Sequence, residues 1–295
     1  MLQRFLDPAT LHSISGLDLV AKTVVQGFIA GLHRSPDFGF SQEFAEYRAY
    51  APGDDLRHVD WNVFARTEKA FLKRYRGETN TQLLVLLDTS ASMGFGSHAV
   101  NKLDYARFLA ASLCYLANQQ RDNAGLIVFD EDVRNCVPPS SRQGQLFRLL
   151  HAVEHAEVGT HTDFAKPFVH VQQFQRRRGL IVVISDFYEQ PEVVIRTVEP
   201  LRHRGNEVIL FHVLDPREIA PKFKEQLLLV DLETKSSMEV SPDYARNEYR
   251  QKIDAHVEQL RSKSKSAGLD YFMMDTGRPL DEGLREYLNI RQGRL

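Results

Sequence analysis

An aspartate and two serines follow a run of five apolar residues in the segment that begins at Leu83 and ends at Met93. These three residues, Asp88, Ser90 and Ser92, occupy alternate positions. Carboxylate and hydroxyl oxygens are hard ligands, so they suit Mg²⁺, Mn²⁺ or Ca²⁺ better than Zn²⁺. The three side chains are therefore candidate ligands of a divalent cation.

The elements that would position these side chains form an alternating pattern. The apolar run is typical of a strand that is buried on both faces of a parallel sheet. Further strand-like segments alternate with amphipathic helices, which predicts βαβ units and a mainly parallel α/β sheet flanked by helices. The strands are expected near 82–88, 125–129, 180–184, 207–214 and 271–274. Such sheets bind ligands at the carboxyl ends of their strands, where Asp88 lies.

A shorter segment, 133–137, is expected to form an antiparallel edge strand. Pro138 and Pro139 are expected to end this strand, because proline cannot donate to a strand ladder. Ser140 and Ser141 would then cap a helix over about 142–155.

The chain is expected to contain two parts. Residues 1–80 would form an N-terminal helix and an extension that pack on the main domain. Residues 81–295 would form the α/β domain, with a hairpin insertion near 216–240. Within that insertion, 227–232 and 237–240 have the character of two short strands joined by a turn.

A second motif precedes the first strand of the sheet. Its residues are Pro52, Gly53, Asp54, Asp55, Arg57, Asp60 and Trp61. Followed by Asp-x-Ser-x-Ser, this motif resembles the bacterial family called domain of unknown function 58, whose members carry a von Willebrand A-like domain. Two motifs in the same order make the resemblance specific, and it extends from about residue 30 to the end of the chain.

The resemblance implies a von Willebrand A-like, Rossmann-type fold and a metal-ion-dependent adhesion site. Its five positions would be Asp88, Ser90, Ser92, Thr162 and Asp186. Mg²⁺ is the expected ion, with Mn²⁺ or Ca²⁺ as alternatives, and retained waters complete its coordination. In such domains an open coordination position accepts an Asp or Glu carboxylate from a partner protein. Thr162 is preferred to Thr160 because of its distance from the helix that follows.

The resemblance also implies a function without catalysis. The chain would be a metal-dependent protein-binding module that acts as an adaptor or co-chaperone beside a MoxR-type AAA+ ATPase. One alternative is a metal-dependent hydrolase that uses Asp88 and Asp186. However, Ser90 stands where phosphatases of the haloacid dehalogenase type need a second Asp. A serine nucleophile would need flanking glycines, and neither Thr89 nor Ala91 fits that requirement. Another alternative is a scaffold with a vestigial metal site, in which these residues only cap helices.

Two other groups of residues admit simpler interpretations. The segment from Pro52 to Trp61 offers three carboxylates, either for partner docking or for acid–base chemistry, but it also fits a tight turn followed by a capped helix. His151 and His155 have the i, i+4 spacing of a helical zinc pair. Two exposed helix histidines are the expected interpretation of that pair.

Composition limits the class of protein. The chain has 295 residues, 43% of them hydrophobic, and a formal net charge of −2, so a nucleic-acid or membrane-surface partner is not expected. Its two cysteines, Cys114 and Cys136, are expected to be separate thiols, as in intracellular proteins. No segment has the apolar length of a membrane span, so the expected location is the cytoplasm.

Overall fold

A computed structural model of the chain shows two compact units. The described residues are 7–14, 16–32, 44–49, 60, 63–64, 66, 69–75, 82–162, 167–168, 170–171, 178–221, 226–230, 232, 236–241, 244, 248–281, 283–285 and 287. One unit comprises Met1–Phe28 with Thr81–Leu295, and the other comprises Ile29–Asn80. The division into 1–80 and 81–295 remains a prediction about domains.

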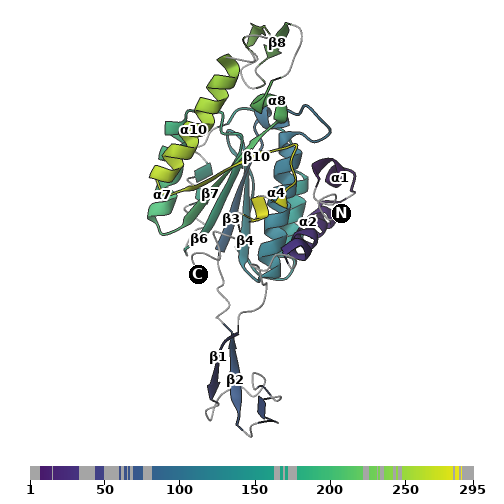
Figure 1. Cartoon of the computed structure of the whole chain (residues 1–295), viewed down its shortest axis with the longest axis vertical. Coiled ribbons are helices and arrows are strands. Elements are labelled where there is room, and N and C mark those ends of the chain that lie inside the picture. The colour runs from purple at the N-terminus through teal and green to yellow at the C-terminus, as the bar shows by residue number, and fades with distance from the viewer. Residues whose placement is uncertain are drawn as a thin grey trace. The chain divides into compact units, whose positions relative to one another are not determined.

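The larger unit is built on a six-stranded sheet in the order β10-β7-β6-β3-β4-β5 (Figure 1). Its strands are β3 (Gln82–Asp88), β4 (Asn123–Phe129), β5 (Val133–Ser140), β6 (Gly179–Ser185), β7 (Glu207–Leu214) and β10 (Asp270–Asp275). Every neighbouring pair is parallel except β4 with β5. The mainly parallel α/β sheet flanked by helices that was predicted from the sequence is confirmed.

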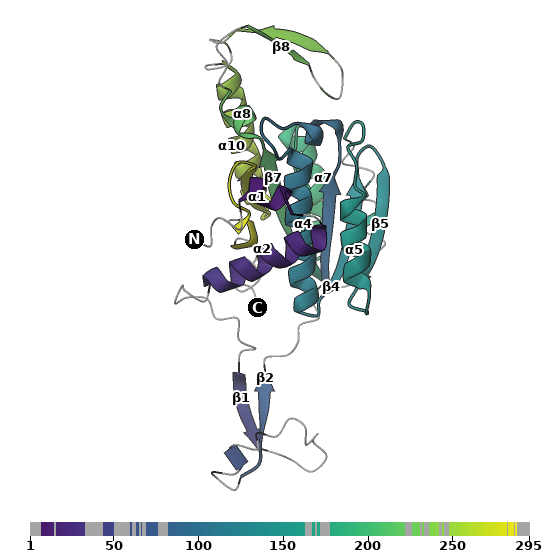
Figure 2. The ribbon, with the colours of Figure 1, turned by 90° about the vertical axis from the view of Figure 1, so that its right-hand side faces the viewer.

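Helices cover both faces of this sheet. They include α4 (Lys102–Gln119), α5 (Gln145–Glu154), α7 (Pro191–His203) and α10 (Arg250–Ser266). Figures 1 and 2 show α4 and α5 on one face and α7 and α10 on the other. The N-terminal helices α1 (Pro8–His12) and α2 (Leu17–Leu32) follow a short Asp7 cap and a turn at Gly16. Ala21 of α2 packs with Ala111 of α4 and Leu150 of α5.

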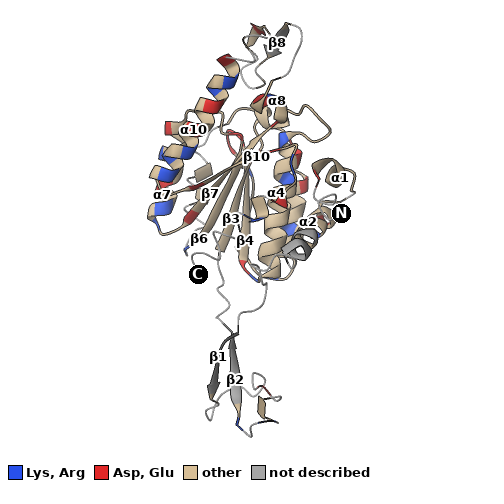
Figure 3. Cartoon of the chain, in the orientation of Figure 1, with Lys and Arg blue, Asp and Glu red and all other residues tan. Residues whose placement is uncertain are grey.

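The core lies around β3, because this strand has neighbours on both edges and helices on both faces. All seven residues of β3 are buried. Leu84 and Leu86 join one apolar cluster with residues of the neighbouring strands and of α7 and α10. Charged residues are distributed accordingly: Figure 3 shows almost none on the strands of this sheet, whereas α10 carries both acidic and basic residues. The residues of β3 before Asp88 carry no charge, so this strand brings a single carboxylate to the edge of the apolar core.

The predicted end of the edge strand is wrong. β5 continues through Pro138 and Pro139 to Ser140, and α5 begins only at Gln145, after Gly144. An edge strand tolerates proline because only one of its sides is paired. The ladder is also irregular between Ala124 and Leu126 of β4. Gly125 permits the close approach there, because a Cβ at this position would lie 2.7 Å from Pro139 Cγ.

The smaller unit contains an antiparallel pair, β1 (Phe44–Ala49) with β2 (Phe71–Tyr75). Six residues of the upstream motif lie outside the described residues: Pro52, Gly53, Asp54, Asp55, Arg57 and Trp61. Asp60 is described and is only 6% exposed. Its Oδ1 accepts a hydrogen bond from the Val63 amide at 3.3 Å, so this carboxylate begins a helical turn.

The remaining elements are short. They are the 3₁₀ turn η3 (Ala91–Gly94), α8 (Pro216–Ile219), and the antiparallel pair β8 (Leu227–Val230) with β9 (Ser237–Val240). Cys114 and Cys136 are both free thiols. Within the described part of the chain, no helix combines the length and the apolar composition needed to cross a membrane.

Candidate metal site

The candidate site lies where β3 and β6 end side by side. The two strands are parallel neighbours, with Leu87 opposite Ile184. The next residues, Asp88 and Ser185, therefore meet, and Asp186 follows at once. Strand order thus brings together residues almost one hundred positions apart in the chain.

Asp88 is fully buried and each of its oxygens accepts a hydrogen bond. Oδ1 accepts from the backbone N–H of Ser90 at 2.8 Å, and Oδ2 accepts from the Ser185 hydroxyl at 2.6 Å. Ser185 Oγ in turn accepts from the Phe187 amide at 2.9 Å. The carboxylate is therefore held in one orientation by both strand ends, as a ligand must be.

The two serine hydroxyls project from the turn after β3. Ser90 is the N-cap residue of η3, yet its side chain makes no capping bond to that helix. Its Oγ lies 3.1 Å from Ser92 Oγ. Adjacent ligands of an octahedral Mg²⁺ with bonds near 2.1 Å lie about 3.0 Å apart. The spacing and the hard-oxygen chemistry of Asp88, Ser90 and Ser92 therefore fit such an ion.

The loop that carries Thr162 lies beside this turn. The Ala91 amide donates to the Thr160 carbonyl at 2.6 Å, and the Gly159 amide donates to the Thr89 carbonyl at 2.7 Å. Thr162 is half-buried, two residues beyond Thr160. The structure thus places the loop that carries Thr162 against the Asp88–Ser92 turn. That Thr162 is a metal ligand remains a prediction. Ser92 is also only partly buried, so the site reaches solvent on this side.

Lys102 enters the site although its position in the sequence gave no signal of it. It is the first residue of α4, and among the described residues it is the one Lys or Arg side chain that is buried. Its Nζ lies 2.7 Å from Asp186 Oδ2 and 2.7 Å from Glu218 Oε1. The Tyr188 ring lies 4.6 Å from the same atom. One of the predicted metal ligands is therefore already paired with an internal cation.

Burial and charge act in opposite directions on these groups. Burial, followed by the nearby charge of Asp186, raises the pKa of Asp88 to about 7, against hydrogen bonds from Ser185 and Ser90 that favour its charged form. Burial alone would lower the pKa of Lys102, but the charges of Asp186 and Glu218 outweigh it and raise that pKa. The ammonium is thus charged at neutral pH, while Asp88 titrates near neutrality.

Glu218 links the site to the end of β7. Asp215 and Glu218 form a capping box at the start of α8, in which Glu218 Oε2 accepts the Asp215 amide at 2.9 Å. The other oxygen of Glu218 pairs with Lys102. Asp215 Oδ2 accepts the Ser97 amide at 2.8 Å. The Asp-Pro-x-Glu spacing signals the capping box in the sequence, but nothing there predicts its contact with Lys102.

The turn after Asp186 has unusual backbone geometry. Phe187 is buried and has a φ of 45°, which is rare for a residue other than glycine. Its carbonyl is hydrogen-bonded to His256 Nε2 of α10 at 3.0 Å. Such strained backbone gathers at binding and catalytic sites. The packing of Phe187 and its contact with α10 therefore hold the turn that carries Asp186.

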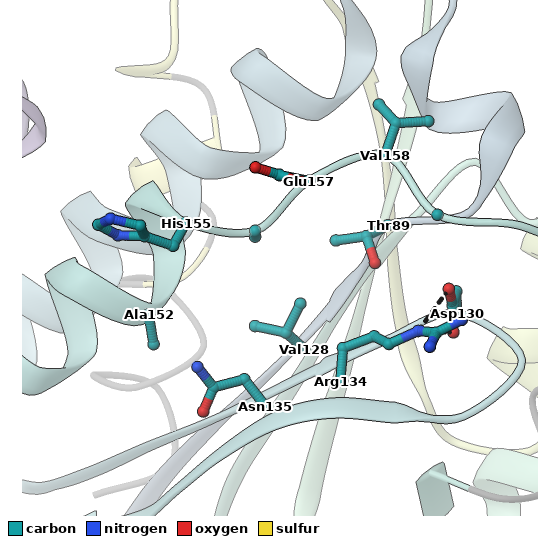
Figure 4. A pocket seen from close by; sticks show the side chains of 11 residues that line it. Thr89, Val128, Asp130, Arg134, Asn135, Ala152, His155, Glu157 and Val158 are labelled. Carbon is teal, nitrogen blue, oxygen red and sulfur yellow. Dashed lines mark hydrogen bonds and ion pairs between the residues drawn. The ribbon is translucent and has the colours of Figure 1, made fainter.

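A hollow of about 280 Å³ is lined in part by Thr89, which follows Asp88 (Figure 4). Thr89, Asp130, Arg134 and His155 are among its lining residues. Arg134 Nε donates to both oxygens of Asp130 at 2.8 Å. Asp130 is buried and also accepts the Thr160 amide at 3.3 Å, so its charge is already satisfied by the protein.

The histidine pair of α5 lies at the protein surface, as expected. His151, Glu154 and His155 are exposed, and their potential ligand atoms lie within 4.8 Å of one another. His155 Nδ1 is 2.9 Å from the His151 carbonyl, within hydrogen-bonding distance. The Phe147 ring stacks on that of His151, with the two ring centroids 6.0 Å apart.

Comparison with other sequences finds a family and several relatives. The model of the family described as "Protein of unknown function DUF58" matches residues 46–262. The uncharacterized protein Rv1480 of Mycobacterium tuberculosis is 29% identical over 296 residues, which cover 98% of this chain and 92% of that protein. The uncharacterized protein MAV169 of Mycobacterium avium is 29% identical over 139 residues, or 45% of this chain and 78% of that protein.

Solved structures give weaker similarities. BatB from Bacteroides thetaiotaomicron has a TM-score of 0.48 and 15% identity, covering 71% of this chain and 98% of that one. An aerotolerance-related membrane protein from Bacteroides fragilis has a TM-score of 0.49 and 16% identity, covering 71% and 99%. The SpRpn10 VWA domain has a TM-score of 0.42 and 12% identity, covering 69% and 93%.

Proposed function

The chain belongs to the DUF58 family of proteins of unknown function, and we propose that it is a non-enzymatic, metal-dependent protein-binding module. The von Willebrand A-like fold supports a role in protein interaction. One observation carries the metal dependence: the hydroxyls of Ser90 and Ser92 lie 3.1 Å apart, next to the fully buried carboxylate of Asp88. Three oxygen donors of the right chemistry are thus held before any ligand binds.

In this proposal Asp88, Ser90 and Ser92 hold the ion, with Asp186 and Thr162 at its periphery. A bound Mg²⁺ would supply an electrophilic position for a partner carboxylate. Ser185 orients Asp88, and the Asp88–Ser92 turn is fixed by its hydrogen bonds to the loop at 159–160. The partly buried Ser92 marks the side from which an Asp or Glu of a partner protein would approach.

The proposed partner is a MoxR-type AAA+ ATPase, beside which the chain would act as an adaptor or co-chaperone in the assembly or activation of protein complexes. This part of the proposal is supported by the resemblance to the family, and it would use the metal site proposed above to bind a carboxylate of the ATPase. Co-purification of tagged protein from its own cells tests it. The wild-type chain should retain an AAA+ ATPase in Mg²⁺ and lose it in EDTA, and Ser90→Ala should lose it in both.

Calorimetric titration with Mg²⁺ tests the site directly. Wild type should take up one ion, whereas Asp88→Ala should take up none and keep its far-UV circular dichroism. Asp254→Asn, which neutralises an exposed carboxylate on α10, is the matched control and should bind as wild type does. Equal heats for wild type and Asp88→Ala would refute the metal site. Turnover of p-nitrophenyl phosphate that disappears in Asp88→Ala would instead favour the hydrolase.

A further inference from the structure

Lys102 is the residue of this site that metal binding does not explain. A buried ammonium must be paired, and here two carboxylates pair with it at 2.7 Å each. Its position is also unfavourable to a cation, because the N-terminus of α4 carries the positive end of the helix dipole. The side chain is thus held at Asp186 by specific charges, against both burial and the dipole.

The contact changes what Asp186 can offer to an ion. Its Oδ2 accepts a hydrogen bond from Lys102 Nζ at 2.7 Å, so the ammonium takes up one lone pair that this oxygen could otherwise offer to a metal. A divalent ion beside Asp88 would also lie close to the ammonium, and like charges in a buried site repel strongly. Both effects oppose metal binding.

Lys102 nevertheless has other contacts if it gives up Asp186. Glu218 Oε1 remains at 2.7 Å, and the ring of Tyr188 lies 4.6 Å from Nζ, within the range of a cation–π contact. The ammonium can therefore leave one carboxylate without losing all its partners. Glu218 is itself fixed by its other oxygen, which caps α8.

We propose that Lys102 is an internal cation that competes with the divalent ion at Asp186 and so keeps the affinity of the site for that ion low. This inference rests on the proposed metal site and adds its regulation. A low intrinsic affinity makes retention of the ion depend on the extra negative charge that a partner carboxylate brings. A substitution beside a metal ligand ordinarily weakens metal binding. Removal of the Lys102 charge should instead strengthen it, because the competing cation is lost.

Titration of the full chain with Mn²⁺, followed by the electron paramagnetic resonance signal of the free ion, tests this inference. Lys102→Gln removes the charge and can still donate to a carboxylate. Its dissociation constant should be at least about tenfold lower than that of wild type, which corresponds to about 1.4 kcal/mol. Asp88→Ala in the Lys102→Gln background should abolish the gain, which places the ion at this site. Glu218→Gln leaves Asp186 as the one carboxylate that pairs with the ammonium, and this variant should bind Mn²⁺ no more tightly than wild type.

The outcomes separate this inference from the proposed function. If wild type binds Mn²⁺ and Lys102→Gln binds it equally or more weakly, the inference is overturned and the metal site stands. If neither protein binds, both fail. Should the variant not fold, ¹⁵N NMR of the lysine ammonium groups in wild type decides: saturating Mg²⁺ should shift the Lys102 resonance and speed its proton exchange, and an unchanged resonance in the presence of bound ion refutes competition.

Discussion

Replacement of Asp88 by asparagine should make the metal-free protein more stable at neutral pH. The amide keeps the shape of the side chain, its oxygen can accept the Ser90 amide, and its nitrogen can donate to Ser185 Oγ. What it removes is a buried negative charge beside Asp186. A residue required for binding would then be one that lowers the stability of the fold.

The magnitude follows from the pKa of Asp88. Its value rises from 3.8 to about 7 on folding, and at about 1.4 kcal/mol for each of roughly three pH units its ionisation costs the folded state about 4 kcal/mol. The folded protein holds this proton more tightly than the unfolded chain. The contribution of Asp88 to stability is therefore greatest below pH 4 and is lost as the pH rises to about 7. Asp88→Asn lacks this dependence.

Urea unfolding in EDTA at pH 5, 6, 7 and 8 measures the effect. The free energy of unfolding of Asp88→Asn should exceed that of wild type by an amount that increases with pH. At pH 8 this difference should reach about 2–4 kcal/mol. Asp254→Asn, on the exposed surface of α10, should give a difference that does not vary with pH. Addition of Mg²⁺ at one hundred times its dissociation constant should stabilise wild type by about 2.7 kcal/mol and the variant far less. A difference between Asp88→Asn and wild type that is constant across this pH range would refute the reasoning.

Three further substitutions probe the parts that support the site. Leu86→Ala, in the fully buried centre of β3, should lower the free energy of unfolding by about 2–5 kcal/mol, and a loss below about 1 kcal/mol in urea would contradict the packing. Gly159→Ala places a Cβ against Asp130 Oδ2 and should lower the melting temperature while it weakens Mg²⁺ binding, so an unchanged calorimetric affinity would show that the 159–162 loop does not support the site. Ser185→Ala removes the hydroxyl that donates to Asp88, and it should cost about 1–3 kcal/mol more at pH 8 than at pH 5 because only the charged carboxylate needs that bond strongly. Equal losses at the two pH values would be evidence against that role.

The sequence alone determined the class of fold and the chemistry at the tip of its first sheet strand. The short apolar run before Asp88 predicts a strand that is buried on both faces. The structure confirms it, since β3 begins and ends at the predicted residues. The two motifs also identified the family, and the family model confirms that resemblance. These features are local or ordered along the chain, so pattern and spacing are enough to find them.

The tertiary structure decided which distant groups meet. Pro138 and Pro139 stay in β5 because that strand lies at the edge of the sheet, which no local pattern shows. No motif in the sequence links Lys102 to this site, but the order of β3, β6 and β7 places Asp186 and Glu218 around it. The physical reason is that a buried charge depends on what the fold packs against it. The oxygen donors of Asp88, Ser90 and Ser92 could be predicted from residue type, whereas the cation that opposes a metal ion there could not.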